Sequence, residues 1–145
     1  MLQVNFTVPG QPRGKGRPRF ARRGNFVTTY TDAATTTYED QIRFYALRAM
    51  GGYKPLTMAL EAFIHVRLPV PQSYSKKRTE ACLSGLERPC KKPDLDNIIK
   101  AMMDGINEVI YDDDVQIVNI TATKLYAAKA EVYILIKEII WLNEN

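Results

Sequence analysis

The feature that most constrains the fold of this chain is the spacing of apolar residues over positions 94–110. At about 100° per residue their side chains fall within an arc of about 140°, and polar side chains fill an opposite arc of about 120°. This pattern predicts an amphipathic helix, and so wide an apolar stripe must be buried against another layer of structure. The apolar positions are Leu95, Ile98, Ile99, Met102, Met103, Ile106, Val109 and Ile110.

Four further segments have the alternation or the β-branched composition of strands. Residues 2–8 alternate loosely up to a Pro-Gly turn signal, and residues 58–68 alternate apolar and polar side chains. Residues 115–126 and 131–140 are rich in Val, Ile, Thr and Tyr and are joined by a short connection. We therefore expect four strands, and we expect the last two to pair with each other in antiparallel fashion.

A second helix is predicted to begin after Thr31-Asp32, a pair with N-cap chemistry, and to end at Gly51-Gly52. The order of elements is then strand, helix, strand, helix, strand, strand. Four strands and two helices fit a two-layer α+β domain, in which one four-stranded mixed sheet carries its helices on one face. A chain of 145 residues suits a single domain, which we expect to span residues 1–145.

Charge is separated along the sequence far more than the net charge of +4 indicates. Residues 1–31 contain six basic residues and no acid, and residues 76–92 contain six basic residues and two acids. Residues 94–114 contain seven acids and one lysine. Because the basic residues fall in segments without apolar periodicity, we expect basic loops at about 10–29 and 69–93. A polyanion-binding surface around a cation-binding centre would give this pattern.

The acidic segment places carboxylates at regular spacing. Asp94 stands at the start of the predicted helix, and Asp96, Lys100 and Asp104 follow in a row along one face. The aspartate triplet 112–114 then leads into a predicted strand. Taken singly, a helix cap, an exposed i,i+4 pair and a solvated turn are ordinary structural features. Together they are harder to explain, because three adjacent aspartates repel one another and turn formation does not require all three.

Carboxylates in this arrangement suit a hard divalent cation. Mg²⁺ binds carboxylate oxygens at about 2.0–2.1 Å and keeps several waters. In nucleases two such ions about 3.5–4 Å apart can clamp the attacking water and the leaving oxygen of a phosphodiester. Lys100, one turn from Asp96, would then lie beside the scissile phosphate and stabilise its developing negative charge. We therefore expect Mg²⁺, or Mn²⁺ in its place, as the cofactor.

Other chemistries fit the sequence less well. An EF-hand loop counted from Asp94 lacks the required Gly and Glu, and no P-loop, nucleophile-elbow or HExxH motif occurs. Cys82, Cys90 and the single histidine, His65, do not supply a zinc site, and we expect two reduced thiols. No apolar run approaches the ~20 residues that span a bilayer, and the N-terminus lacks a signal-peptide core. We expect a cytoplasmic protein with no membrane partner.

These motifs resemble those of the RusA family of Holliday junction resolvases, which are bacterial and prophage enzymes. The N-terminal run from Pro12 to Phe20 is similar to a basic segment of family members from Gram-positive bacteria and their phages. The resemblance covers roughly residues 4–137 and is most specific over 93–118. It is carried by Pro93-Asp94-Leu95-Asp96-Asn97, by Lys100 and Asp104 on the same helix, and by Asp113-Asp114 with Gln116 before a strand.

The resemblance implies a structure-selective endodeoxyribonuclease of a bacterial or phage-infected cell, which resolves four-way DNA junctions in recombination and repair. It also implies a homodimer that makes paired nicks. The triplet leaves the register open by one residue; Asp114 is chosen because Gln116 keeps the family's spacing from it, and in an extended strand Asp113 would point the opposite way. The implied catalytic residues are Asp94, Asp96, Lys100 and Asp114, and the implied metal ligands are Asp94, Asp96, Asp113 and Asp114.

The two basic segments form the predicted DNA-binding surface, since Lys and Arg neutralise phosphates and release counterions. Glycines among the N-terminal cations would let the backbone approach a phosphate, and neighbouring aromatic side chains could stack on unpaired bases. Two alternatives stay open: a non-catalytic DNA-binding accessory protein whose acidic patch is structural, and a metal nuclease for flaps or single strands. The predicted DNA-binding residues are Arg13, Lys15, Arg17, Arg19, Lys76, Lys77, Arg78, Lys91 and Lys92.

Overall fold

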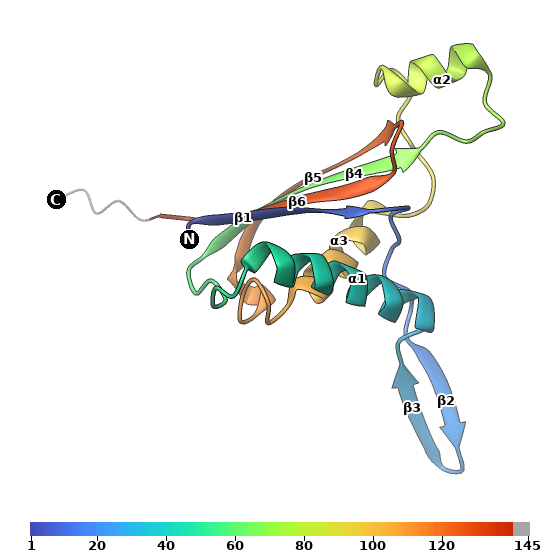
Figure 1. Ribbon diagram of the computed structural model, residues 1–145. Helices are drawn as coiled ribbons and strands as arrows, with labels where there is room; N and C mark the ends of the chain where they lie inside the picture. Colours follow the sequence, from blue (N-terminus) through green and yellow to red (C-terminus); the bar gives the residue numbers. More distant parts are fainter. Residues whose placement is uncertain (141–145) are drawn as a thin grey trace.

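The sheet of this protein has the strand order β1-β6-β4-β5, as seen in a computed structural model that describes residues 1–140 (Figure 1). The strands are β1 (Gln3–Pro9), β6 (Glu131–Glu138), β4 (Leu60–Pro69) and β5 (Ile117–Ala127). β6 is antiparallel to both β1 and β4, whereas β5 is parallel to β4. The predicted α+β fold with a mixed four-stranded sheet is therefore confirmed. The last five positions of the predicted domain lie outside the described residues.

The predicted pairing of the last two strands is wrong, because β4 lies between β5 and β6. After β4 the chain returns through a helical connection to the end of the sheet where β4 began, and there it enters β5. A crossover connection of this kind places β5 parallel to β4. β6 then uses both of its edges, one for β4 and one for β1. A short connection between two strand patterns therefore did not mean a hairpin here.

Two helices cover one face of the sheet, as the sequence predicts (Figure 1). α1 (Ala33–Met50) begins after Asp32, whose carboxylate accepts a hydrogen bond from the Thr35 N–H, and ends at Gly51 in the left-handed conformation. α3 (Leu95–Ile106) crosses α1 closely at Gly105, where a Cβ would lie 2.7 Å from the Ile42 side chain.

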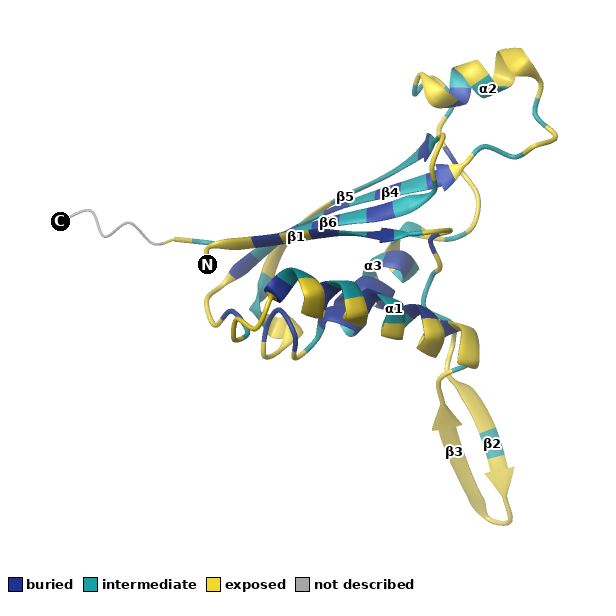
Figure 2. Ribbon diagram, viewed as in Figure 1, coloured by how far each residue is buried: buried dark blue, intermediate teal, exposed yellow. Residues whose placement is uncertain are grey.

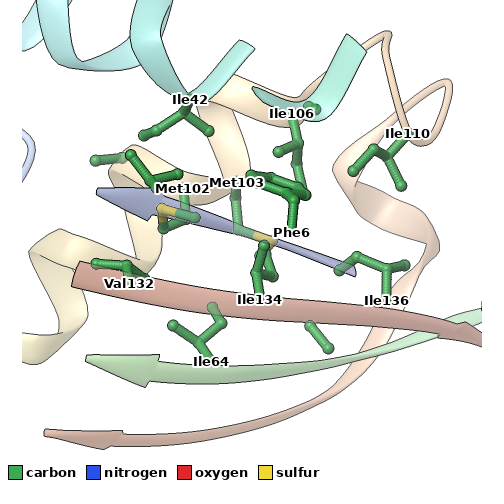
Figure 3. Packing of buried hydrophobic residues seen from close by; sticks show 14 of the residues in the cluster. Phe6, Ile42, Ile64, Met102, Met103, Ile106, Ile110, Val132, Ile134 and Ile136 are labelled. Atoms are coloured by element: carbon green, nitrogen blue, oxygen red, sulfur yellow. The ribbon is translucent and has the colours of Figure 1, made fainter. Parts of the chain in front are cut away.

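The core lies between these helices and the sheet (Figure 3). Every second residue of β4 and β6 faces it, and the residues between them are half-buried on the opposite face. The side chains drawn and labelled in this core are Phe6, Ile42, Ile64, Met102, Met103, Ile106, Ile110, Val132, Ile134 and Ile136.

α3 ends four residues before the predicted boundary. Glu108 has a left-handed backbone with φ of 63°, which an α-helix does not allow, and the chain turns there. Val109 and Ile110 are still buried, so their apolar character belongs to the turn that closes the core. The Tyr111 hydroxyl donates to the Met103 carbonyl at 2.5 Å and fastens this turn to the helix.

The predicted loop 10–29 is wrong in part, because it contains an antiparallel hairpin of β2 (Arg19–Arg23) and β3 (Phe26–Tyr30). The two-residue connection Gly24-Asn25 makes the turn, with Gly24 at a φ of 60°, and Val, Thr and Tyr in β3 favour extended backbone. The sequence pattern concealed these strands because neither has a buried face. Figure 2 shows the hairpin as an exposed arm that projects beyond α1.

The predicted loop 69–93 contains a helix as well, α2 (Lys76–Leu83), whose first turn is capped by the Ser75 hydroxyl. Cys82 is its only buried residue, so it has no apolar stripe to detect. α2 projects beyond the same end of the sheet as the hairpin, toward the opposite side (Figure 1). Among the described residues, the helices are all too short or too polar to cross a bilayer.

Candidate active site

The start of α3 presents a free carboxylate. Asp94 occupies the N-cap position, but its side chain makes no capping hydrogen bond, unlike Asp32 and Ser75 at the other two helices. The capping role that the sequence allowed for Asp94 is therefore not observed, and its exposed carboxylate remains available to a ligand. Lys124 of β5 holds the preceding turn by donating to the carbonyl of Pro93 at 3.1 Å and to that of Lys91 at 2.8 Å.

The polar face of α3 carries the remaining helical candidates. Asp96 and Lys100 are both exposed, and in residues 1–140 they form no ion pair with each other. Asp104, two turns beyond Asp96, is half-buried and contacts Lys15. The row predicted from the spacing is thus present, and its inner end lies against neighbouring elements.

The aspartate triplet does not lie in a strand. Residues Asp114–Gln116 form a single 3₁₀ turn, and β5 begins only at Ile117, so the predicted alternation of side chains along the triplet does not apply. Asp113 caps this turn by accepting a hydrogen bond from the Val115 N–H at 3.2 Å.

Gln116 fixes the position of this turn. Its side-chain oxygen accepts hydrogen bonds from the N–H groups of Asp112 and Asp113, at 2.8 and 3.1 Å. Its amide nitrogen donates to the carbonyls of Leu56 and Met58, at 2.8 and 3.1 Å. One amide side chain therefore ties the triplet to the segment that leads into β4.

Three carboxylates from α3 and the turn influence one another. A hydrogen bond to the Asp113 side chain raises the pKa of Asp114 above its ordinary value, and burial and the charges of Asp113 and Asp104 raise it further. Burial raises the pKa of Tyr111 strongly, and the same three aspartates add to the effect. The turn and the inner end of α3 therefore form one acidic region, in which a bound cation would relieve the repulsion.

The donor chemistry of this region fits Mg²⁺, although the ligand set is not assembled. The exposed carboxylates of Asp94, Asp96 and Asp114 are hard oxygen donors, and the repulsion between Asp113 and Asp114 favours a cation. Within residues 1–140, however, no three His, Cys, Asp or Glu side chains lie close enough together to hold an ion. The carboxylates would need to move together on metal binding.

Lys15, one of the predicted DNA-binding residues, is half-buried between two helices. Its ammonium is 2.5 Å from Glu39 Oε1 of α1 and 2.9 Å from Asp104 Oδ2 of α3, and its side chain is only 18% exposed. Burial opposes the charge, but the hydrogen bonds to Glu39 and Asp104 outweigh it and raise the pKa of Lys15. The lysine therefore belongs to the acidic region.

A cleft of about 400 Å³ joins the two basic segments to the start of α3. Arg13 and Lys15 come from the N-terminal segment and Lys92 from the segment after α2, and Asp94 lies between them. The sequence analysis placed cations and carboxylates in separate segments, and the fold brings them to one opening. The lining residues are Pro12, Arg13, Gly14, Lys15, Lys92, Pro93, Asp94 and Asn97.

The remaining predicted DNA-binding residues fall into two groups. Arg17 and Arg19 are exposed at the base of the hairpin, and Lys76 and Lys77 are exposed in the first turn of α2. Arg78 is also exposed but lies 3.6 Å above the ring of Tyr74 and donates to Glu87 at 2.9 Å. The exposed Lys91 donates to the Tyr74 hydroxyl at 3.4 Å.

The sequence analysis missed three residues that shape the site. Glu39 shows no motif, because only the packing of α1 against α3 brings it to Lys15. Lys124 lies in a strand pattern that gave no reason to single it out. Gln116 served only to choose which aspartate of the triplet matches the family pattern. Its position between an acidic turn and a strand also suits a side chain that accepts hydrogen bonds from the backbone N–H groups of the turn.

Comparisons with known proteins identify the family of this chain. A family model described as "Endodeoxyribonuclease RusA" matches residues 9–137. A protein of Bacillus subtilis (strain 168), named "Uncharacterized protein YqaN", is 33% identical over 141 residues, which cover 94% of this chain and 96% of that protein. The match includes the N-terminal basic segment, the carboxylate helix and the aspartate turn.

Proposed function

This chain belongs to the RusA endodeoxyribonuclease family, and from that premise we propose that it is a Mg²⁺-dependent endonuclease that resolves four-way DNA junctions by paired nicks. Membership establishes a nuclease family that acts on Holliday junctions. The metal dependence, the residues that carry it and the dimeric state are our proposals. We place the reaction in the cytoplasm of a bacterial or phage-infected cell, during DNA recombination and repair.

The cleft at the start of α3 is the observation that carries the proposal. Arg13 and Lys92, from two basic segments far apart in the sequence, line this cleft together with Asp94, whose carboxylate makes no capping hydrogen bond. A phosphodiester drawn in by the two cations would lie beside a carboxylate that can hold a metal ion. A DNA-binding protein without catalysis has no need of an aspartate that stands at the start of a helix without capping it.

We assign the metal to Asp94, Asp96, Asp113 and Asp114. When bound, Mg²⁺ would supply a Lewis acid for the phosphodiester and for its attacking water. Gln116 holds the aspartate turn to the segment that leads into β4, and Lys124 of β5 holds the turn before Asp94. Lys100 extends from the exposed face of α3 and would stabilise negative charge on the phosphate.

The sheet face opposite α1 and α3 is the surface that we propose for a second copy of the chain. Phe63, Tyr133 and Leu135 are half-buried there, and within residues 1–140 α1 and α3 both lie on the other face, while α2 packs against β5. The charged side chains of β4 and β6 on this face are two acids and two bases and cancel. A neutral, partly apolar sheet face suits a protein copy better than DNA.

The first prediction tests the enzyme and its metal site together. We expect the wild-type protein to nick a synthetic mobile four-way junction only when Mg²⁺ or Mn²⁺ is present. Asp96→Asn keeps the size of the side chain but removes a charge that a hard cation needs, so the single-turnover rate should fall by about 10³-fold while junction binding is retained. Asp114→Asn should behave in the same way.

Asp112→Asn is the matched control, because Asp112 belongs to the same turn but does not enter the acidic region around Asp104. Its rate should stay within about threefold of wild type. Full activity of Asp96→Asn would overturn the metal site. Tight junction binding without metal-dependent cleavage by the wild type would favour the accessory protein, and faster cleavage of flaps than of junctions would favour the flap nuclease.

A further inference from the structure

The N-terminal segment before the hairpin is attached to both helices by its backbone. The Lys15 N–H donates to the Asn97 carbonyl of α3 at 2.9 Å, and the Gly16 N–H donates to the buried Thr35 hydroxyl of α1 at 2.9 Å. The hairpin begins at Arg19, three residues further on. We call residues 13–16 the arm root.

The two glycines of the arm root lie in close contact with the helices. A Cβ on Gly14 would lie 2.9 Å from the Asn97 Cβ, which is closer than side chains tolerate. A Cβ on Gly16 would clash with the Asp32 carboxylate that caps α1. The absence of a side chain at these two positions therefore allows the backbone to lie against α3 and the N-terminus of α1.

The side chain between these glycines continues along the groove of the two helices. Lys15 reaches Glu39 on α1 and Asp104 on α3, and all three side chains are at most about one-third exposed. A lysine that satisfies two carboxylates in this way is not free to bind a phosphate, because releasing it would leave two partly buried charges unpaired. Asp104 in turn belongs to the acidic region of the proposed active site.

The hairpin itself has almost no other support. Every residue of β3 is exposed, and β2 has only Ala21 partly covered. Neither strand packs substantially on another described element, so the direction of the arm depends on its connections to the body of the protein. On the N-terminal side, that connection is the arm root.

We infer that Lys15 is a positioning residue that fixes the DNA-binding arm in register with the active-site carboxylates. DNA held by Arg17, Arg19 and the rest of the arm would be placed relative to α3 through the Glu39–Lys15–Asp104 ion pairs. The inference rests on the proposed function. A displacement of about 1 Å between substrate and catalytic groups can cost about 10²-fold in rate, so an anchor of this kind affects chemistry without touching DNA.

The test compares Lys15→Met, which removes the charge, with Lys15→Arg, which keeps it. Junction affinity is measured without Mg²⁺, and the single-turnover rate and the nick positions are measured with Mg²⁺ on an immobile four-way junction. For Lys15→Met we expect affinity within about threefold of wild type, a rate lowered by about 10-fold to 100-fold, and nicks spread over neighbouring phosphodiesters. Lys15→Arg should restore much of the rate and the single nick position.

Lys54→Met is the matched control, since Lys54 is exposed in the loop after α1 and makes no ion pair within residues 1–140. It should leave the nick position unchanged. If Lys15→Met instead weakens binding by about 10-fold and leaves the rate at saturation unchanged, Lys15 is a phosphate contact and the inference fails. An unchanged rate with unchanged nick positions also overturns it.

Hydrogen exchange on the DNA-free protein tests the anchor even if the wild type does not cut junctions, an outcome that would overturn the proposed function alone. In Lys15→Met the amides of Lys15 and Gly16 should exchange at least about 10-fold faster, with α3 unchanged. Unchanged exchange at these amides would contradict the anchor. If Lys15→Met does not fold, Glu39→Gln removes one ion pair outside the acidic turn, and its exchange and nick positions should change in the same direction.

Discussion

The N-terminal arm (residues 13–30) and the segment that carries α2 (residues 69–93), here called the lobe, each contain six basic residues, but they use their charges differently. Past the arm root, Arg17, Arg19, Arg22 and Arg23 are exposed and make no ion pair within the part of the chain that the structure describes. In the lobe, Arg78 pairs with Glu87 and stacks on Tyr74.

The difference follows from what each region has available to fold with. The arm is a hairpin whose strands pair with each other, so its arginines are not needed for internal contacts. In the lobe, α2 has one buried side chain, Cys82, and further polar contacts lie around Tyr74 and Glu87. An equal number of basic residues in two segments therefore does not mean equal affinity for DNA, because cations that hold a fold together are less available to phosphates.

Reversal of the two arginines at the base of the arm should have the largest effect on binding. The double variant Arg17→Glu and Arg19→Glu should lose two phosphate contacts. Junction binding should weaken by about 100-fold, and the slope of log Kd against log salt concentration should decrease by about 1.8. Fluorescence anisotropy over a salt series measures both. An unchanged slope would mean that the arm lies away from DNA, and the contrast with the lobe would be lost.

Reversal of the two lysines at the start of α2 should have a smaller effect. Lys76→Glu with Lys77→Glu should weaken junction binding by about 10-fold, because these lysines lie on only one of two basic projections. The melting temperature should rise slightly, since acidic side chains suit the first turn of a helix better than lysines do. Binding lost as strongly as in the arm variant would show that the lobe is an equal partner.

Removal of the charge on Glu87 should have the smallest effect, and only on stability. The hydrogen bond from the Cys82 thiol, and then the contact with Arg78, lower the pKa of Glu87. Because the pKa is lower in the folded state, ionised Glu87 stabilises the fold above its unfolded pKa of about 4.3, and this contribution is lost as pH falls through the folded value. Glu87→Gln should therefore lower the melting temperature at pH 7 by a few degrees, with the difference disappearing in acid.

Melting curves of both proteins at pH 7 and pH 3 check this prediction. A difference that persists at pH 3 would show that the glutamine disturbs packing rather than charge. Junction binding should stay close to wild type at pH 7. A marked loss of binding would mean that Glu87 organises the lobe for DNA, and the lobe's polar contacts would then serve recognition as well as folding.

The sequence by itself determined the elements whose burial follows a regular period. The stripe on α3 and the alternation of β4 had to be buried, and both are at the core. The separation of acidic and basic segments, together with the Asp94–Asn97 motif, was sufficient to indicate a nuclease of the family that the comparisons show. These features are local, because side chains three or four residues apart on a helix, or two apart on a strand, share one environment.

The tertiary structure alone decided which segments meet. The position of β4 between β5 and β6 follows from contacts between distant segments. The hairpin and α2 are mostly exposed, so neither leaves an apolar pattern in the sequence. Lys15 had the same sequence signature as the arginines beside it, yet it lies between two carboxylates of different helices. A charge in a sequence carries no record of its partner, because the partner is set by packing between distant segments, and only the folded chain distinguishes a cation that binds DNA from one that holds the protein in place.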